Sequence, residues 1–296
     1  MKMFWNGVGL TVPDDWEVAR IGKSRLTFRR GDRPVADIQW RRGDASVNFP
    51  AVIEQRKRTC RKRGDVLSPI SFPKEMPQPN DVEWGGFEWE NDEWKGIEIL
   101  RLCRRCRTVT DFRWTVSSGI SGRVPISWVD ILAVLDGFSD HETAFGIRFA
   151  LYDIEVIVPQ DFRLERYAFY PGLFELQFQA ERGNIRFLRW AAAAERLRNH
   201  SLESFAEMVC GKSEWTACHD PSIGDVRIGY PQPQGWLGRV LSARHRSWFL
   251  IRLDRNMNRI LGVYYRGKKA HPHSEILRFG RMVSIAQEET RAAAVD

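Results

Sequence analysis

The chain has 296 residues, of which 43% are hydrophobic and 28% are charged. This composition excludes long disordered stretches and predicts enough apolar surface for two cores of ordinary domain size. The formal net charge of +7 permits an acidic partner, but 38 acidic residues against 45 basic ones exclude a histone-like chain.

Membrane and secretory features are missing from the sequence. No run approaches the roughly 18 apolar residues of a transmembrane helix, and the N-terminal residues lack the apolar core of a signal peptide. Five cysteines form an odd and sparse set, unlike a secreted disulfide framework. We therefore expect a cytoplasmic protein without a membrane span.

The two halves of the chain begin with similar stretches. Residues 10–18 match residues 156–164: in both, an apolar strand ends at a proline and an aromatic residue starts the next strand. Proline lacks a donor for the sheet ladder and fixes φ, so each strand must stop there. Further along, the matches are residues 26–28 with 176–178, and Trp40 with Trp190.

Two helices are expected in each half. The first covers residues 46–63 and 201–210, and the second begins at Ser127 and at Ser274. Serine favours the start of a helix because its hydroxyl accepts a hydrogen bond from a free backbone N–H. The residues expected to cap helices in this way are Ser46, Ser201 and Ser274.

A β-hairpin is expected between the helices of each half. Its first strand includes residues 100–102, which match residues 251–253. The return strands cover residues 108–116 and 260–265, where apolar and polar residues alternate. A period of two is typical of a half-buried strand.

Each half is thus predicted to contain three strands, a helix, three strands and a helix. Adjacent strands joined by tight turns form an antiparallel sheet, which helices then cover. The predicted fold class is α+β: two tandem repeats of an antiparallel sheet covered by helices. The first repeat spans residues 1–140 and the second spans residues 141–296, with a short polar boundary at residues 139–143.

The opening element of each repeat resembles the PsbP/Mog-like α/β sandwich, a superfamily named for an extrinsic photosystem II subunit and a Ran-binding protein. Residues 9–16 and residues 156–162 carry the resemblance. The pattern also looks like the domain of bacterial chaperones that adapt effectors to type VI secretion. Such domains are mostly non-catalytic scaffolds, so the resemblance implies two tandem copies with a binding or adaptor role. It carries over no site residues.

A Cys-x-x-Cys sequence, Cys103 to Cys106, falls at the predicted hairpin tip. A turn can aim both thiolates at one zinc ion, but a tetrahedral ion needs four ligands, and Cys60 offers only a third. The neighbouring arginines would instead lower the thiol pKa values and favour a redox-active pair. The second half has Asp254 and Met257 at these positions, so the fold itself does not require thiols. Structural cysteines, zinc ligands and a redox pair all stay open.

Six of the eight residues from 56 to 63 are basic, and an arginine-rich hairpin tip follows at residues 101–107. On a helix, six such residues cover most of the circumference, so no single face buries them. Phosphate groups or an acidic protein surface would match this charge, and a solvated helix end is the alternative. The residues expected to form the basic surface are Arg56, Lys57, Arg58, Arg61, Lys62, Arg63, Arg104 and Arg105.

Two other segments contain residue types found in catalytic sites, but neither predicts one. Residues 81–93 interleave acidic and aromatic side chains, which strand alternation explains by itself. This acidic segment could meet the basic helix of a second copy, so self-association is a further expectation. Cys218, His219 and Asp220 are consecutive on a predicted strand, where neighbours point to opposite faces and cannot converge as a triad.

The sequence contains no G-x-x-x-x-G-K-[ST], H-E-x-x-H or G-x-S-x-G motif. We therefore predict a non-catalytic binding or adaptor protein, without a cofactor unless zinc is bound, whose duplicated domain engages a protein partner. One alternative is nucleic-acid binding through residues 56–63 and 101–107. The other is a zinc or redox function of Cys103 and Cys106.

Overall fold

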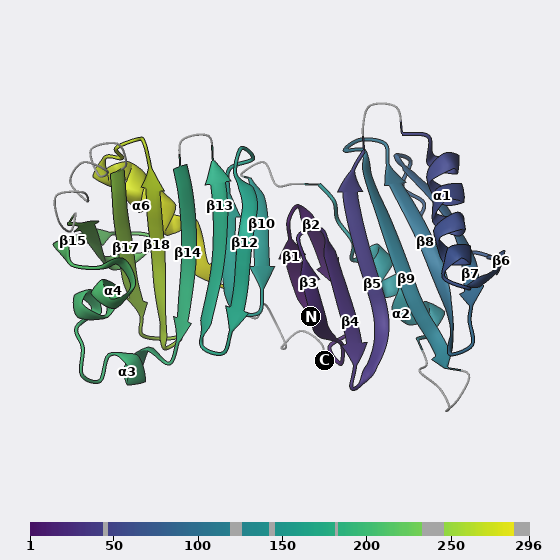
Figure 1. Cartoon of the computed structure of the whole chain (residues 1–296), viewed down its shortest axis with the longest axis horizontal. Coiled ribbons are helices and arrows are strands. Elements are labelled where there is room, and N and C mark those ends of the chain that lie inside the picture. The colour runs from purple at the N-terminus through teal and green to yellow at the C-terminus, as the bar shows by residue number, and fades with distance from the viewer. Residues whose placement is uncertain (44–46, 119–125, 142–145, 181–182, 233–245, 287–296) are drawn as a thin grey trace. The chain divides into compact units, whose positions relative to one another are not determined.

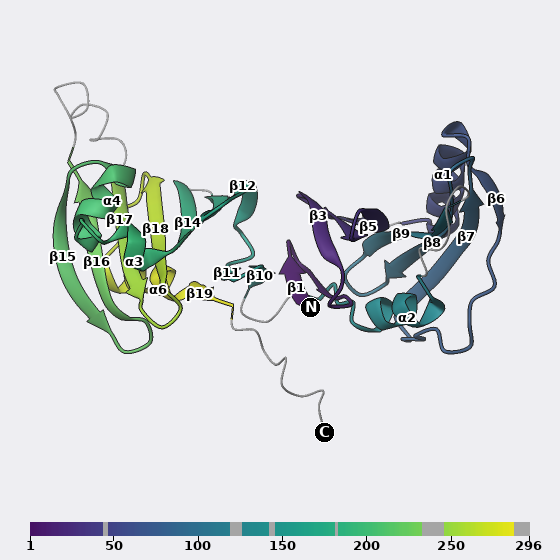
Figure 2. The same cartoon turned by 90° about the horizontal axis from the view of Figure 1, so that it is seen from below.

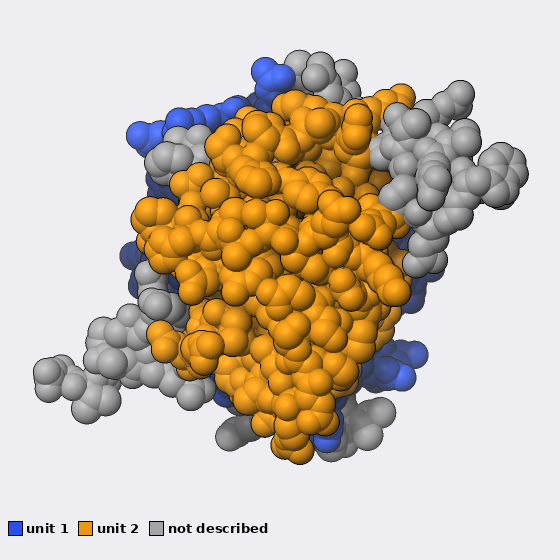
Figure 3. Space-filling model, turned by 90° about the vertical axis from the view of Figure 1, so that its left-hand side faces the viewer, with its two compact units in different colours: residues 1–142 blue, residues 143–296 orange. Residues whose placement is uncertain are grey.

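Extended, aromatic-rich segments make up most of the chain and hydrogen-bond into antiparallel sheets (Figure 1). The computed structural model describes residues 1–296 apart from 44–46, 119–125, 142–145, 181–182, 233–245 and 287–296. The chain divides into two compact units, residues 1–142 and 143–296 (Figure 3). Among the described residues, no helix is both long and apolar enough to cross a membrane.

The first unit contains nine strands and two helices in its described part. In chain order they are β1 (Lys2–Trp5), β2 (Val8–Thr11), β3 (Glu17–Gly22), β4 (Arg25–Arg30), β5 (Arg33–Arg42), α1 (Phe49–Lys62), β6 (Val66–Pro69), β7 (Val82–Glu90), β8 (Trp94–Cys103), β9 (Thr108–Ser118) and α2 (Trp128–Asp136).

The second unit follows with a similar succession of elements. In chain order they are β10 (Ile147–Leu151), β11 (Ile154–Val158), β12 (Arg163–Tyr170), β13 (Leu173–Ala180), β14 (Gly183–Ala191), α3 (Ala193–Arg196), α4 (Leu202–Cys210), β15 (Ser213–Asp220), β16 (Gly224–Pro231), β17 (Arg246–Asp254), β18 (Arg259–Gly267), α6 (His273–Arg281) and β19 (Val283–Ile285).

The same strand order recurs in the large sheet of each unit. The first sheet has the order β3-β4-β5-β9-β8-β7-β6, and the second has the order β12-β13-β14-β18-β17-β16-β15. The first strand of each sheet carries a β-bulge, between Val18 and Arg20 in one and between Leu164 and Arg166 in the other. Both units are therefore α+β with one connectivity, and each is preceded by a short hairpin, β1–β2 or β10–β11.

The strand–proline–aromatic element takes the same form in both units. After β2, the Trp16 N–H donates to the Pro13 carbonyl at 3.1 Å. After β11, the Phe162 N–H donates to the Pro159 carbonyl, also at 3.1 Å. Each proline thus ends its strand and opens a tight turn into the large sheet, as the sequence predicts.

Helices cover opposite faces of the large sheet in the first unit, α1 on one face and α2 on the other (Figure 2). The α1 helix starts behind Asn48, whose side chain accepts a hydrogen bond from the Ala51 N–H at 3.1 Å. The α2 helix starts with a capping box between Ser127 and Asp130. Local side-chain caps therefore set where both helices begin.

An aromatic cluster fills the α2 side of this sheet. Phe112 stacks on Trp114 with ring centroids 6.0 Å apart and meets Phe138 edge-on at 5.0 Å. Trp16 packs against Trp114 and Phe28, at 6.0 Å in each case. A large part of the hydrophobic core of the unit lies here, because Trp16, Phe28, Phe112 and Trp114 are all fully buried.

The helix starts differ in part from those expected. Ser201 caps α4 as predicted, with its hydroxyl accepting from the Ser204 N–H at 3.1 Å. Residue 46 lies outside the described residues, and the cap of α1 is Asn48. Ser274 is not a cap, because α6 already begins at His273.

The number of strands also differs from the prediction. In its described part, each unit has five strands before its first sheet-covering helix and four between that helix and the last one, where the sequence suggested three and three; β19 follows the last helix of the second unit. The additional strands include β1, β10 and β6, which are four or five residues long. Strands this short leave too few alternations to be recognised.

The match of Trp40 with Trp190 is wrong by one residue. Trp190 pairs across its sheet with Ile260, the counterpart of Val109 in the first unit. The residue paired with Val109 is Arg41, not Trp40. A shift of one residue moves a side chain to the other face, so the two tryptophans lie on different faces of their sheets.

Phe112→Ala is expected to lower the free energy of unfolding of the first unit by about 3–5 kcal/mol, because it leaves a cavity beside Trp114 and Phe138. Val129→Ala is the control: this α2 residue is 75% exposed, so the change should stay within about 0.5 kcal/mol. Urea unfolding followed by tryptophan fluorescence measures both. An effect of Phe112→Ala no larger than that of the control would contradict the placement of the core.

Candidate metal centre

The tip of the β8–β9 hairpin holds both thiols of the Cys-x-x-Cys sequence. Cys103 ends β8, and Cys106 lies in the turn before β9 starts at Thr108. The Arg107 N–H closes the turn by donating to the Cys103 carbonyl at 2.8 Å, with Arg107 at a left-handed φ of 60°. Both cysteines are free thiols. The hairpin therefore offers two sulfur donors at one place.

Two further donors come from the segment after α2. Ser139 pairs with Gly9 of β2 through hydrogen bonds in both directions, at 2.6 and 2.9 Å. This pairing fixes the path of the chain beside β2. Asp140 and His141, the next two residues, consequently reach the hairpin tip.

The four donors lie close together. The Sγ atom of Cys103 is 3.2 Å from Nε2 of His141, and the Sγ atom of Cys106 is 3.1 Å from Oδ2 of Asp140. Oδ1 of Asp140 is 3.6 Å from Nε2 of His141. One donor atom from each of the four residues lies within 4.8 Å of all the others.

This donor set fits Zn²⁺. Thiolate, imidazole and carboxylate are the ligands of tetrahedral zinc sites, whose donor atoms are about 3.3–3.8 Å apart when the bonds measure about 2.0–2.3 Å. The three separations of 3.1–3.6 Å given above are close to that spacing, and the donor atoms all lie within 4.8 Å of one another. Cys103 and Asp140 are buried and His141 is exposed, so an ion here would be shielded on most sides.

The carboxylate of Asp140 forms an ion pair with a buried arginine, Arg101. Nη1 of Arg101 donates to Oδ2 of Asp140 at 2.6 Å, and both side chains are buried. The Arg101 guanidinium also lies 5.0 Å from the centre of the Phe138 ring. Two thiolates, one carboxylate, a divalent ion and Arg101 sum to zero net charge, which favours burial of the complete site.

The pKa of the Cys106 thiol is raised, not lowered. Burial raises the pKa of the Cys106 thiol to about 11, and the Asp140 carboxylate adds to the increase. The predicted lowering by arginines is absent because Arg101 faces Asp140 and Arg104 pairs with Glu83. The Cys106 thiol is therefore protonated near neutral pH unless a metal ion displaces the proton.

Cys103 and His141 are also within reach of each other as a nucleophile and a base. In a catalytic triad, the carboxylate holds the ring nitrogen that the nucleophile does not use. Here Asp140 and Cys103 face the same nitrogen, Nε2, and Cys103 is fully buried. Convergence on one nitrogen favours a shared ion over nucleophilic catalysis.

Some of the predicted basic residues form ion pairs within the first unit, and the others are exposed without an ion pair among the described residues. Arg56 turns inward to pair with Glu98 and Asp111, and Arg63 pairs with Asp65 at 3.6 Å. Lys57 pairs with Glu54 of its own helix, and Arg104 pairs with Glu83. The predicted basic residues that are exposed and make no ion pair among the described residues are Arg58, Arg61, Lys62 and Arg105.

The two predicted basic segments lie near opposite ends of α1. The Gly43 N–H donates to the Arg107 carbonyl at 2.8 Å, which places the hairpin tip near the start of α1. Arg61 and Lys62 lie in its last turn. A helix of 14 residues is about 21 Å long. Cys60 is also far from the tip: its thiol is 3.9 Å from Glu98, so it is no third ligand.

Sequence reasoning found the two cysteines but not Asp140 and His141. Asp140 lies 34 residues after Cys106, and both missed residues were assigned to the boundary between repeats. The pairing of Ser139 with Gly9 that delivers them is a tertiary contact. No local spacing could signal it.

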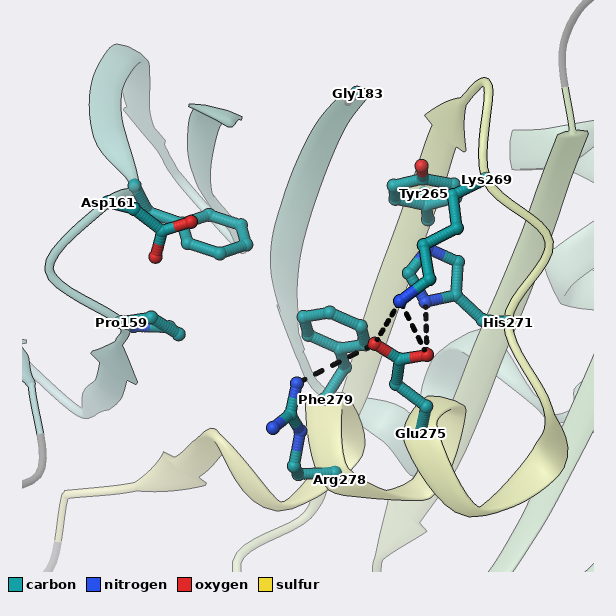
Figure 4. Close-up of a pocket in the computed structure, with 10 residues that line it drawn as sticks. Pro159, Asp161, Gly183, Tyr265, Lys269, His271, Glu275, Arg278 and Phe279 are labelled. Atoms are coloured by element: carbon teal, nitrogen blue, oxygen red, sulfur yellow. Dashed lines mark hydrogen bonds and ion pairs between the residues drawn. The ribbon is translucent and has the colours of Figure 1, made fainter. Parts of the chain in front are cut away.

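The second unit has a cavity of about 450 Å³ beside α6 and the turn after β11 (Figure 4). Its basic side chains converge on the carboxylate of Glu275: Lys269 at 3.1 Å, His271 at 3.1 Å and Arg278 at 3.7 Å. Asp161 lies on the opposite wall (Figure 4). The carboxylates of Glu275 and Asp161 match the two permanent cations, Lys269 and Arg278, in number, so the lining carries no excess charge while His271 is neutral.

No protein-family model and no curated protein matches the chain. Among solved structures, the chain is similar to the immunity protein TplEi of T6SS from Pseudomonas aeruginosa, complexed with "L" peptide. The two chains share 10% sequence identity with a TM-score of 0.37, over 96% of this chain and 97% of the other. A likeness of this degree carries no argument about function, which must come from the side chains.

Acidification is expected to destabilise the second unit through His271. Burial holds the pKa of His271 below its ordinary 6.5, although Glu275 raises it in part. The unfolded chain binds this proton more readily, so the stability is complete above the unfolded pKa of about 6.5 and falls as the pH drops towards the lowered folded value.

His271→Phe should flatten this pH dependence, since the ring between Tyr265 at 4.4 Å and Phe279 at 5.5 Å remains while the titration is lost. Urea unfolding between about pH 5 and pH 7.5 measures it. The control is His219→Asn, which replaces an exposed histidine. Equal pH slopes for all three proteins would contradict the assignment.

Proposed function

We propose that this chain is a metal-stabilised binding protein, in which a zinc ion ties the β8–β9 tip to the segment after α2. The observation that carries the proposal is the gathering of four donor atoms within 4.8 Å. Cys103, Cys106, Asp140 and His141 would hold the ion, which when bound links two chain segments and so adds to folding stability. Four protein ligands leave no open position, so the role is structural rather than catalytic.

We also propose that the two units are tandem copies of a PsbP/Mog-like sandwich. The shared strand order and the shared bulge support a duplication. Register along β17–β18 and β11–β19 identifies the positions of the second unit that match the four ligands. They hold Asp254, Met257, Ile285 and Ala286. Only Asp254 offers a metal donor there, so the second unit does not hold the complete set of four.

Partner binding is assigned to the exposed end of α1. Arg58, Arg61 and Lys62 are exposed and make no ion pair within the described part of the chain. An acidic protein surface would complement these three charges, which supports an adaptor role without catalysis. Nucleic acid is the alternative partner. It predicts an affinity for duplex DNA that falls steeply with salt and disappears when the three residues are neutralised.

Metal analysis of the tag-free protein is expected to find a single zinc ion per chain. Cys106→Ser and Asp140→Asn should each abolish stoichiometric binding, because each removes one of four ligands. Cys210→Ser is the matched control, since this half-buried cysteine lies in the second unit. Zinc at 100 times its dissociation constant should stabilise the wild type and the control by about 2.7 kcal/mol, and the ligand variants by much less.

Two outcomes would contradict this proposal. One is a wild-type protein that stays free of zinc after reconstitution under reducing conditions. The other is a pair of ligand variants, Cys106→Ser and Asp140→Asn, that bind zinc with the affinity of the control.

A further inference from the structure

A cluster of charged side chains is buried between α1 and the sheet of the first unit. Glu98 of β8 is completely buried; it accepts hydrogen bonds from Arg56 of α1 and, at 3.0 Å, from Arg113 of β9. Nε of Arg56 also lies 2.7 Å from Oδ2 of Asp111, and Nη2 of Arg113 lies 3.1 Å from Oδ2 of Asp65. None of these groups belongs to the proposed metal centre.

In the second unit, the corresponding contact between α4 and the large sheet contains a cluster of apolar residues. Phe205 of α4 packs edge-on against Trp190 at 5.3 Å, inside a buried hydrophobic cluster. By strand register, Glu98, Asp111 and Arg113 correspond to Phe249, Gly262 and Tyr264. Gln39 and Arg41 correspond in the same way to Leu188 and Trp190.

This difference indicates a function for the charged cluster. Buried ion pairs often stabilise a protein no better than apolar residues of similar volume. At the positions that match Glu98, Asp111 and Arg113, the second unit places no charged residue between helix and sheet. Charged groups with strongly perturbed environments concentrate at functional sites. The cluster therefore serves a purpose other than holding α1 on the sheet.

A cavity of about 400 Å³ lies beside the cluster. It occurs where Gln39 and Arg41 stand in place of the larger apolar pair Leu188 and Trp190. Its volume is within the range of small-molecule sites. The polar residues that line it are Ser24, Gln39, Arg41, Gln55, Arg56, Thr59 and Asp111.

We propose that this cavity binds a small anion, a carboxylate or a phosphate group on a small polar body, through Arg56 and Arg41. Both ion pairs of Arg56 and its hydrogen bond use Nε. Within the described part of the chain, its two terminal amino groups make no hydrogen bond. A guanidinium with two free amino groups suits a carboxylate or phosphate, and Gln55 and Thr59 can donate to the rest of the ligand.

The charge balance of the cluster supports an anion. Burial raises the pKa of Asp111 well above its ordinary value, and the neighbouring Glu98 carboxylate adds to the increase. Among the residues that line the cavity, Arg41 and Arg56 are cations and Asp111 is the one acid. The exposed Arg41 then gives the cavity an excess of positive charge.

Calorimetric titration of the full chain with inorganic phosphate and, separately, with succinate tests the proposal. We expect saturable binding of one probe, which identifies the phosphate or carboxylate chemistry. Arg56→Gln should weaken that binding about 10-fold or more, as for the loss of a charged hydrogen bond. Asp111→Asn, which mimics the neutral acid, should retain it.

Two further variants provide a second test of the cavity and a control. Arg41→Gln changes an exposed residue, so it should weaken binding in a folded protein even if Arg56→Gln fails to fold. Arg227→Gln is the control, because Arg227 forms an ion pair between sheet and helix, with Glu203, in the second unit. Absence of saturable binding by the wild type, or equal affinities for the wild type and Arg41→Gln, would overturn the proposal.

Discussion

The buried ion pair between Arg101 and Asp140 is the interaction on which the organisation of the first unit depends. It joins the sheet to the segment that follows α2, at 2.6 Å and almost without solvent access. Removal of either partner would leave an unpaired buried charge, which typically costs about 3–5 kcal/mol. With Asp140 held in place, His141 must lie beside Cys103. The ion pair between Arg101 and Asp140 thus holds the segment after α2 on the sheet and also brings the proposed zinc ligands together.

Strand β8 contributes residues to the proposed metal centre on one face of the sheet and to the buried charged cluster on the other. Successive side chains of a strand point to opposite faces. Arg101 and Cys103 therefore lie on the α2 side, where they meet Asp140, whereas Glu98 lies on the α1 side, where it meets Arg56. The metal centre and the charged cavity need not communicate, and each can be altered without the other.

Local signals in the sequence predicted local structure, and tertiary contacts decided the rest. Pro13 and Pro159 end strands because proline has no donor, a property that needs no partner. His141 could not be recognised as a ligand, since only the folded chain brings it to the cysteines. Arg56 was expected at the surface because a helix of basic residues has no apolar face, but its partner Glu98 is 42 residues away.

The central claim is that one ion joins the hairpin tip to the segment after α2. X-ray absorption at the zinc edge, measured on the full reconstituted chain, tests it most directly because it counts donors by element and distance. We expect two sulfur atoms at about 2.3 Å and two nitrogen or oxygen atoms at about 2.0–2.2 Å. A shell of four sulfur atoms, or one without sulfur, would contradict the assignment of Cys103, Cys106, Asp140 and His141.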